Sequence, residues 1–249
     1  MLKLMKYEFR KQLFSKIFIL LILAVLEVMF LYGLFAESDK ALGVSMGLFT
    51  FVSFAAVLIV MFECIFTFSN DLKTKQSYML FLTPNSTYKI IGAKVLSSVI
   101  YVLLTAAALI AVTIMNAGIY VVKNEELAKL WDLLKELFYR ISAIDVNIAL
   151  IITIILYFLF DLIGMMVIGM ASITLSATFL SNTKGKAVVS VIFFFGINFL
   201  TSKLENILPS IDWRHLELQP FYYHCIFSAV VMVVFYFATA WMLDKKVSV

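Results

Sequence analysis

The sequence predicts an all-α, polytopic membrane protein with six transmembrane helices. Of its 249 residues, 63% are hydrophobic and only 14% are charged, and the mean hydropathy is +1.01, a balance that soluble domains do not have. Six apolar runs are also long enough for spanning helices, because a helix needs roughly 20 largely apolar residues to cross about 30 Å of hydrocarbon. Residues 1–249 are therefore expected to form a single transmembrane domain.

The six runs follow one another along the chain. They cover residues 17–36, 42–68, 90–122, 148–180, 187–200 and 221–243. The third and fourth runs exceed one bilayer thickness, so we expect these helices to tilt, kink or project from the membrane. The fifth run is short and extends toward Lys203. The first run follows a basic N-terminus, but no small-x-small cleavage site comes after it, so we expect a retained helix and not a secretory signal.

Basic residues are distributed unequally between the two sides of this predicted topology. One side holds 13 of the 20, from the N-terminal segment, residues 69–94, the loop after the fourth run, and the chain end at Lys245 and Lys246. The other side holds seven, although its loops are longer. Because cytoplasmic loops carry the excess of basic residues, both termini and residues 69–89 are predicted to be cytoplasmic. The net charge of +4 thus reflects topology, and no basic face with stacking residues indicates nucleic-acid binding.

Residues 1–16 are predicted to form an amphipathic N-terminal helix. Leu2, Met5, Phe9 and Leu13 recur at helical spacing, whereas the basic residues take the other faces. Such a helix lies in the headgroup region, where its cations contact anionic lipids. The alternative is a charged tail that only sets the topology.

Two segments are predicted to lie on the outer side of the membrane. Residues 123–147 place leucines and aromatic residues on one stripe, with most charged residues off it, which is typical of an amphipathic extracellular helix on the surface. Residues 202–220 contain Pro209 and Trp213 among polar residues and predict an interrupted outer segment of interfacial turns.

No catalytic motif occurs in the context that its chemistry needs. The stretch GVSMG, residues 43–47, matches a nucleophile motif that works only on a strand-to-helix turn. At the start of a membrane helix, Gly43 and Gly47 instead predict a helix-packing surface. His215 and His224 do not form a zinc-ligand pattern, and the sequence contains no P-loop. We expect no enzymatic activity, metal or cofactor in this chain, and any ATP and Mg²⁺ would bind a partner subunit.

Five polar residues lie within the apolar runs, where an unpaired ionisable group costs at least a few kcal/mol. They are Glu27, Glu63, Asn116, Asp161 and Asn198. Glu27 and Asp161 lie well inside their runs, so they either face an aqueous or protein-lined path or are protonated and bonded across helices. Glu63 lies about one turn from the predicted cytoplasmic end of its run, where water or a loop lysine reaches it or where it transmits motion.

The segment between the second and third runs, residues 69–89, is longer than a turn requires. Residues 73–82 can form a short helix with one apolar side, which Pro84 ends, and an exposed apolar side needs a partner. The stretch LFLTPNSTYKIIGAK, residues 80–94, is similar to the segment that joins spans two and three in permeases of the type-2 ATP-binding-cassette (ABC-2) exporter family. The N-terminal helix, the six spans and the interrupted outer segment extend this resemblance over most of the chain.

The resemblance implies that residues 71–84 form a coupling helix, which docks on a separate ATP-binding-cassette ATPase subunit and relays its closure to the spans. The coupling residues would be Asp71, Lys73, Tyr78, Leu80, Phe81, Leu82, Thr83 and Pro84. The resemblance also implies a second permease copy or a sister permease, contact with membrane lipids, and export of a peptide, antibiotic or lipid by alternating access. Residues 75–77 are Lys-Gln-Ser where the family commonly has Gly-Thr.

Two other functions remain open. An ion-coupled secondary transporter or channel would use Glu27 and Asp161 as coupling groups, and its activity would not need an ATPase. A non-transporting sensor or immunity subunit would couple to an ATPase without substrate flux. Only three of the 20 basic residues are arginine, which is typical of an AT-rich bacterial genome, so the expected location is the bacterial cytoplasmic membrane.

Overall fold

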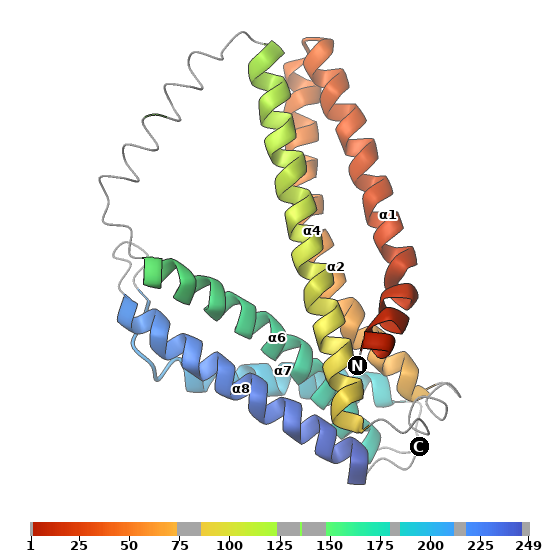
Figure 1. Ribbon diagram of the computed structural model, residues 1–249, viewed down its shortest axis with the longest axis vertical. Helices are drawn as coiled ribbons and strands as arrows, with labels where there is room; N and C mark the ends of the chain where they lie inside the picture. Colours follow the sequence, from red (N-terminus) through yellow and green to blue (C-terminus); the bar gives the residue numbers. More distant parts are fainter. Residues whose placement is uncertain are drawn as a thin grey trace. The chain divides into compact units, whose positions relative to one another are not determined.

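The computed structural model describes residues 2–73, 86–123, 135, 148–179, 185–211 and 218–245. Six long helices account for nearly all of these residues, and none of them lies in a β-strand (Figure 1). The helices are α1 (Leu2–Phe35), α2 (Asp39–Lys73), α4 (Thr87–Lys123), α6 (Ile148–Phe179), α7 (Lys186–Glu205) and α8 (Leu218–Lys245). Each is long and apolar enough to cross a membrane, which confirms the all-α class and a long helix at each of the six apolar runs. The side on which the termini lie stays a prediction.

The third and fourth predicted spans are long, as the sequence indicates. Helix α4 contains 37 residues and α6 contains 32, so at about 1.5 Å per residue both exceed about 30 Å of hydrocarbon. The short fifth run also becomes a full span, because α7 continues to Glu205 and contains 20 residues.

The predicted surface segments are described only in part. Residues 2–16 are helical but continue without a break into the first span, and Leu2 and Leu13 on the predicted apolar stripe are exposed, whereas Glu8 is buried. Of residues 123–147, the structure describes only the end of α4 and the exposed, helical Lys135. The interrupted segment 202–220 comprises the end of α7, a turn described to residue 211 and the start of α8, with Trp213 outside the described residues.

Contacts between residues divide the chain into two compact units, which we describe separately. The first unit contains Met1–Phe9, Met61–Val99 and Ile148–Val249. The second unit contains Arg10–Val60 and Ile100–Asn147. Helices α1, α2 and α4 therefore each contribute residues to both units.

In the first unit, α6 packs against α7 and α8. Fully buried side chains of this core include Met166, Val167, Met170 and Ala240. Gly169 lets α6 and α2 approach closely, because a Cβ atom at this position would overlap the side chain of Ile65. The Tyr236 hydroxyl of α8 donates a hydrogen bond to the carbonyl oxygen of Tyr88, at 2.7 Å, and so joins α8 to the start of α4.

In the second unit, a tight turn joins α1 to α2. A Cβ atom at Gly33 would lie 2.7 Å from the backbone nitrogen of Leu42, so only glycine fits there without a shift of the backbone. Glu37 has a φ of 54°, and the Ser38 N–H donates to the Gly33 carbonyl oxygen at 3.1 Å. This left-handed residue after a helix is a common C-terminal capping arrangement. It directs the chain from α1 into α2.

Candidate functional site

A buried lysine joins three segments of the first unit. Lys94 lies near the start of α4, and the residue is 1% exposed. Its Nζ atom lies 2.6 Å from Oε1 of Glu8 in α1 and also binds Oδ2 of Asp71 in the last turn of α2. Glu8 and Asp71 are themselves buried, with 3% and 5% exposure. We call these three residues the Lys94 cluster.

The electrostatics of the Lys94 cluster explain why it holds these segments together. Removing a single charge from water costs several kcal/mol, and only a well-bonded counter-charge offsets that cost. Lys94 has two carboxylates, so the ammonium is fully compensated and the ionised cluster carries a formal charge of −1. The second oxygen of Glu8, Oε2, is buried and has no hydrogen-bond partner among the described residues. Separating either acid from Lys94 would thus leave an uncompensated charge in the interior.

Backbone contacts reinforce the same position. The Cys64 thiol of α2 lies 3.8 Å from the Lys94 carbonyl oxygen, and the Ser97 hydroxyl donates to that oxygen at 2.9 Å. Helix α2 is therefore tied to α4 through both the side chain and the main chain of Lys94.

The predicted coupling residues meet different outcomes. Asp71 is buried, because its carboxylate pairs with Lys94 in the interior, and its role in coupling stays a prediction. Lys94, counted above with the loop cations, is likewise a buried residue of α4. Lys73 is the last residue of α2. The other coupling residues, Tyr78, Leu80, Phe81, Leu82, Thr83 and Pro84, lie outside the described residues.

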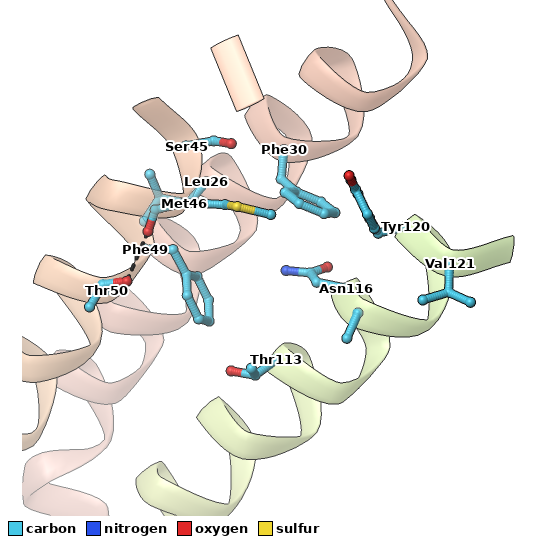
Figure 2. A pocket seen from close by; sticks show the side chains of 11 residues that line it. Leu26, Phe30, Ser45, Met46, Phe49, Thr50, Thr113, Asn116, Tyr120 and Val121 are labelled. Atoms are coloured by element: carbon cyan, nitrogen blue, oxygen red, sulfur yellow. Dashed lines mark hydrogen bonds between the residues drawn. The ribbon is translucent and has the colours of Figure 1, made fainter. Parts of the chain in front are cut away.

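A second group of predicted polar residues lies in the second unit. The Asn116 side-chain amide of α4 donates a hydrogen bond to Oε2 of Glu27 in α1, at 3.1 Å. Asn116 also lines a pocket of about 400 Å³ between α1, α2 and α4 (Figure 2). Glu27 and Asn116 were predicted independently of each other, and the structure brings them together across two helices. Glu27 thus has a bond across helices next to a pocket, and whether it is charged or protonated stays open.

The third group surrounds a small cavity of about 50 Å³ in the first unit. Asp161 of α6 and Asn198 of α7 both line it, together with Thr201 and Glu205. The Asn198 amide donates to the carbonyl oxygen of Phe194 in its own helix, at 2.8 Å. The structure thus brings Asp161 and Asn198 to one polar cavity.

Next to this cavity, a histidine binds an acid at the end of α7. The His224 ring of α8 lies with Nδ1 2.8 Å from Oε1 of Glu205 and with Nε2 3.0 Å from the carbonyl oxygen of Pro209. The Tyr157 hydroxyl of α6 donates to the same Glu205 oxygen at 3.2 Å. A carbonyl only accepts hydrogen bonds, so Nε2 carries a proton. Glu205 therefore connects α6, α7, α8 and the turn after α7.

The glycine pair and Glu63 are the remaining predicted sites. A Cβ atom added at Gly43 or Gly47 would meet nothing within 4 Å in the described chain, so the helix-packing surface stays a prediction. Glu63 is a half-buried residue of α2. Among the described residues, no group of three or more histidine, cysteine or acidic side chains can hold a metal ion.

Sequence reasoning missed Glu8, His224 and Glu205 as partners in buried polar groups. A signal for Glu8 was present, since it is an isolated acid in a basic N-terminal segment and Lys94 lies inside a predicted span. No local signal relates His224 to Glu205. Comparisons with protein-family models, with curated proteins and with solved structures each find no match to this chain.

Proposed function

We propose that this chain is the transmembrane permease subunit of an ABC-2 type exporter in a bacterial cytoplasmic membrane. A separate ATPase subunit would bind and hydrolyse ATP, and two permease copies, or this chain and a sister permease, would enclose the path. The substrate would be an amphipathic or hydrophobic molecule such as a peptide, an antibiotic or a lipid. Support comes from the six apolar helices and from the resemblance of residues 80–94 to the coupling segment of that family.

The single observation that carries this proposal is the position of the Lys94 cluster. Residues 74–85 connect α2 to α4, and the cluster binds Asp71 just before them to Lys94 just after them. The same lysine binds Glu8 of α1. A force applied to this segment would therefore act on three helices at once, because breaking any of these contacts would leave a buried charge without its partner.

This arrangement suggests how ATP hydrolysis would move the spans. Closure of the ATPase subunits would displace the coupling segment, and the Lys94 cluster would pass that displacement to the parts of α1, α2 and α4 that lie in the first unit. Transport would then follow if the inward and outward states bind the substrate with different affinities. Asp71 acts here as an internal anchor, and the docking surface would be formed by the apolar residues that follow it.

Co-purification with the ATPase encoded beside this chain tests the proposal. Wild type in mild detergent is expected to retain the ATPase, and a Leu80→Glu/Phe81→Glu variant is expected to lose it, because charges would disrupt an apolar docking surface. A Gln76→Glu/Ser77→Glu variant adds the same charge at polar positions of the same segment and is expected to retain it. Absence of the ATPase from the wild-type preparation would overturn the proposal.

The cavity beside Asp161 favours a second candidate, an ion-coupled transporter. Asp161, Asn198, Thr201 and Glu205 offer oxygen atoms around one small space, which a cation or a proton can use. In that case, transport in proteoliposomes would need an ion gradient and no ATPase, and Asp161→Asn would abolish it. A sensor or immunity subunit would instead stimulate or bind an ATPase while moving no substrate.

A further inference from the structure

We propose that the pocket of the second unit binds an amphipathic amine, with the ammonium group at Glu27 and Asn116 and the apolar body against the lining side chains. Binding of this ligand does not depend on the exporter assignment. Only the step from ligand to transported substrate rests on the proposed function.

The size and lining of the pocket suit the apolar part of such a molecule. Its volume of about 400 Å³ lies in the range of sites for drug-sized ligands, which is roughly 300–1,000 Å³. Aromatic and aliphatic side chains make up most of its wall (Figure 2). They include Leu26, Phe30, Met46, Phe49 and Tyr120.

Of the four hydroxyl-bearing residues of the wall, the serine and the two threonines already donate within their own helices, and the fourth is Tyr120. The Ser45 hydroxyl donates to the Leu42 carbonyl at 2.9 Å, that of Thr50 to Met46 at 3.0 Å, and that of Thr113 to Leu109 at 2.8 Å. These three groups therefore have no donor left for a ligand.

Two acceptors remain unsatisfied within the described chain, one on the pocket wall at Asn116 and one on Glu27, which lies behind the wall and bonds to Asn116. Oε1 of Glu27 and Oδ1 of Asn116 are both buried and have no hydrogen-bond partner among the described residues. Glu27 fixes the orientation of the Asn116 amide, because Nδ2 of Asn116 donates to Oε2 of Glu27 and Oδ1 is left as the acceptor. Figure 2 shows the Asn116 amide projecting from α4 into the pocket. A ligand that satisfies this pair must therefore donate hydrogen bonds.

Charge distinguishes an amine from a neutral donor. A carboxylate within a membrane span is costly unless it is paired, and the Asn116 amide supplies a hydrogen bond but no counter-charge. An ammonium group supplies both the charge and up to three donors, and nearby aromatic rings attract a cation further. An anionic ligand would be repelled by Glu27. The chemistry that completes this site is an alkylammonium group attached to an apolar body.

Two sources supply such a group, a free amphipathic amine or a phosphatidylethanolamine headgroup. We commit to the free amine, because Glu27 lies two turns inside α1 from its end at Phe35, whereas lipid headgroups lie at the membrane surface. The lipid is tested as a competitor.

Binding to the purified full chain, without any ATPase, tests the inference. The chain is placed in nanodiscs of phosphatidylcholine, which has no primary amine, and binding is followed by fluorescence against empty nanodiscs. The first probe is 1,12-diaminododecane with a dansyl group on one nitrogen, which keeps one ammonium. The second is its N-acetyl derivative, which has the same body and no charge. Saturable binding of the ammonium probe at least about tenfold tighter than the acetyl probe is expected, since a charge-assisted hydrogen bond contributes about that factor.

Two variants test whether the preference for the ammonium probe over the acetyl probe comes from Glu27. Glu27→Gln is nearly isosteric and is expected to reduce the ratio between the two probes to about one. Glu37→Gln removes an acid of the same unit that is exposed and outside the pocket, and it is expected to leave the ratio unchanged. Size-exclusion profiles and thermal unfolding of each variant show that it is folded.

Three results would overturn the inference. Equal binding of both probes would mean an apolar pocket without charge selectivity. A preference that survives Glu27→Gln would place the ammonium elsewhere. Loss of probe binding in nanodiscs that contain phosphatidylethanolamine would identify the lipid as the occupant. Failure of this experiment leaves ATPase co-purification untouched, so the two proposals fail separately.

Discussion

The Nζ atom of Lys94 lies 2.6 Å from Oε1 of Glu8, although 86 residues separate them in the chain and both side chains are almost fully buried. Glu8 belongs to the start of α1 and Lys94 to the start of α4. Asp71 of α2 shares the same ammonium group. The helices on both sides of residues 74–85 are thus fastened to the N-terminal helix at one point.

Replacing Lys94 with methionine is expected to lower stability by about 3–5 kcal/mol, because two buried acids would lose the ammonium group that pairs with them and an unpaired buried charge costs that much. Thermal unfolding of the variant in mild detergent measures this loss. A Glu8→Gln/Asp71→Asn/Lys94→Met variant removes all three charges and is expected to recover most of it. If Lys94→Met unfolds at the wild-type temperature, the cluster does not hold these helices together.

The neutral triple variant also separates stability from coupling. Under the proposed function, its ATPase partner is expected to co-purify normally, because the docking residues are intact. Transport is expected to fall at least about tenfold, since methionine donates no hydrogen bond and the charge-assisted bonds that join position 94 to Glu8 and Asp71 would be lost. Wild-type transport by this variant, measured in proteoliposomes, would show that coupling does not pass through Lys94.

Gly169 is expected to accept a side chain only if Ile65 moves away. Gly169→Leu would overlap Ile65 of α2 and should cost about 1–3 kcal/mol, as overpacked cores do. Gly196 of α7 serves as the control, because a Cβ atom there meets nothing within 4 Å. The smaller change Gly169→Ala should also lower the unfolding temperature in detergent. Adding Ile65→Ala to it should recover part of this loss, because the overlapping side chain is then removed. Purely additive effects would contradict direct packing between these two residues.

Gly33 controls the approach of α1 to α2. Gly33→Ala would bring a Cβ atom to 2.7 Å from a backbone nitrogen of Leu42, so the turn must open. A destabilisation of about 1–3 kcal/mol is expected, seen as a lower unfolding temperature. The matched change Gly43→Ala, at an open position of the same unit, should be neutral or slightly stabilising because alanine favours helix. Equal effects of both changes would argue against the close contact.

His224 is expected to stabilise the end of α7 and the start of α8, which the predicted topology places on the outer side of the membrane. His224→Phe would remove the partner of Glu205 and the bond to the Pro209 carbonyl, at a cost of about 1–3 kcal/mol. Tyr157→Phe removes one weaker bond to Glu205 and should cost about 0.5–1.5 kcal/mol. Tyr222→Phe, at an exposed position of α8, is the control and should change little. The order of the three unfolding temperatures checks this assignment.

Several features of the site were within reach of the sequence. Glu27, Asn116, Asp161 and Asn198 stood out because polar groups in apolar runs need a partner, and each one contacts another polar group or lines a cavity with one. What the sequence did not indicate was the pairing. Glu27 and Asn116 are 89 residues apart, and nothing in either span marks the other as its partner.

Some interpretations changed when the helices were placed together. Asp71 belonged to a predicted docking surface, but its carboxylate is buried against Lys94. Lys94 itself was counted among loop cations, although it is a core residue of α4. In the sequence, a basic residue near the end of an apolar run indicates the cytoplasmic side of the membrane. Only the acids that lie next to Lys94 in the folded chain show that it is buried.

The sequence by itself determined the helical class and the six spans, because a run of about 20 apolar residues in a bilayer satisfies its backbone only as a helix or within a closed barrel. Only the tertiary structure decided that Lys94 meets Glu8, that Glu27 meets Asn116 and that His224 meets Glu205. These contacts depend on how each helix is rotated about its axis. Helices that are apolar on nearly every side carry little local periodicity to fix that rotation, so packing against the other helices sets it.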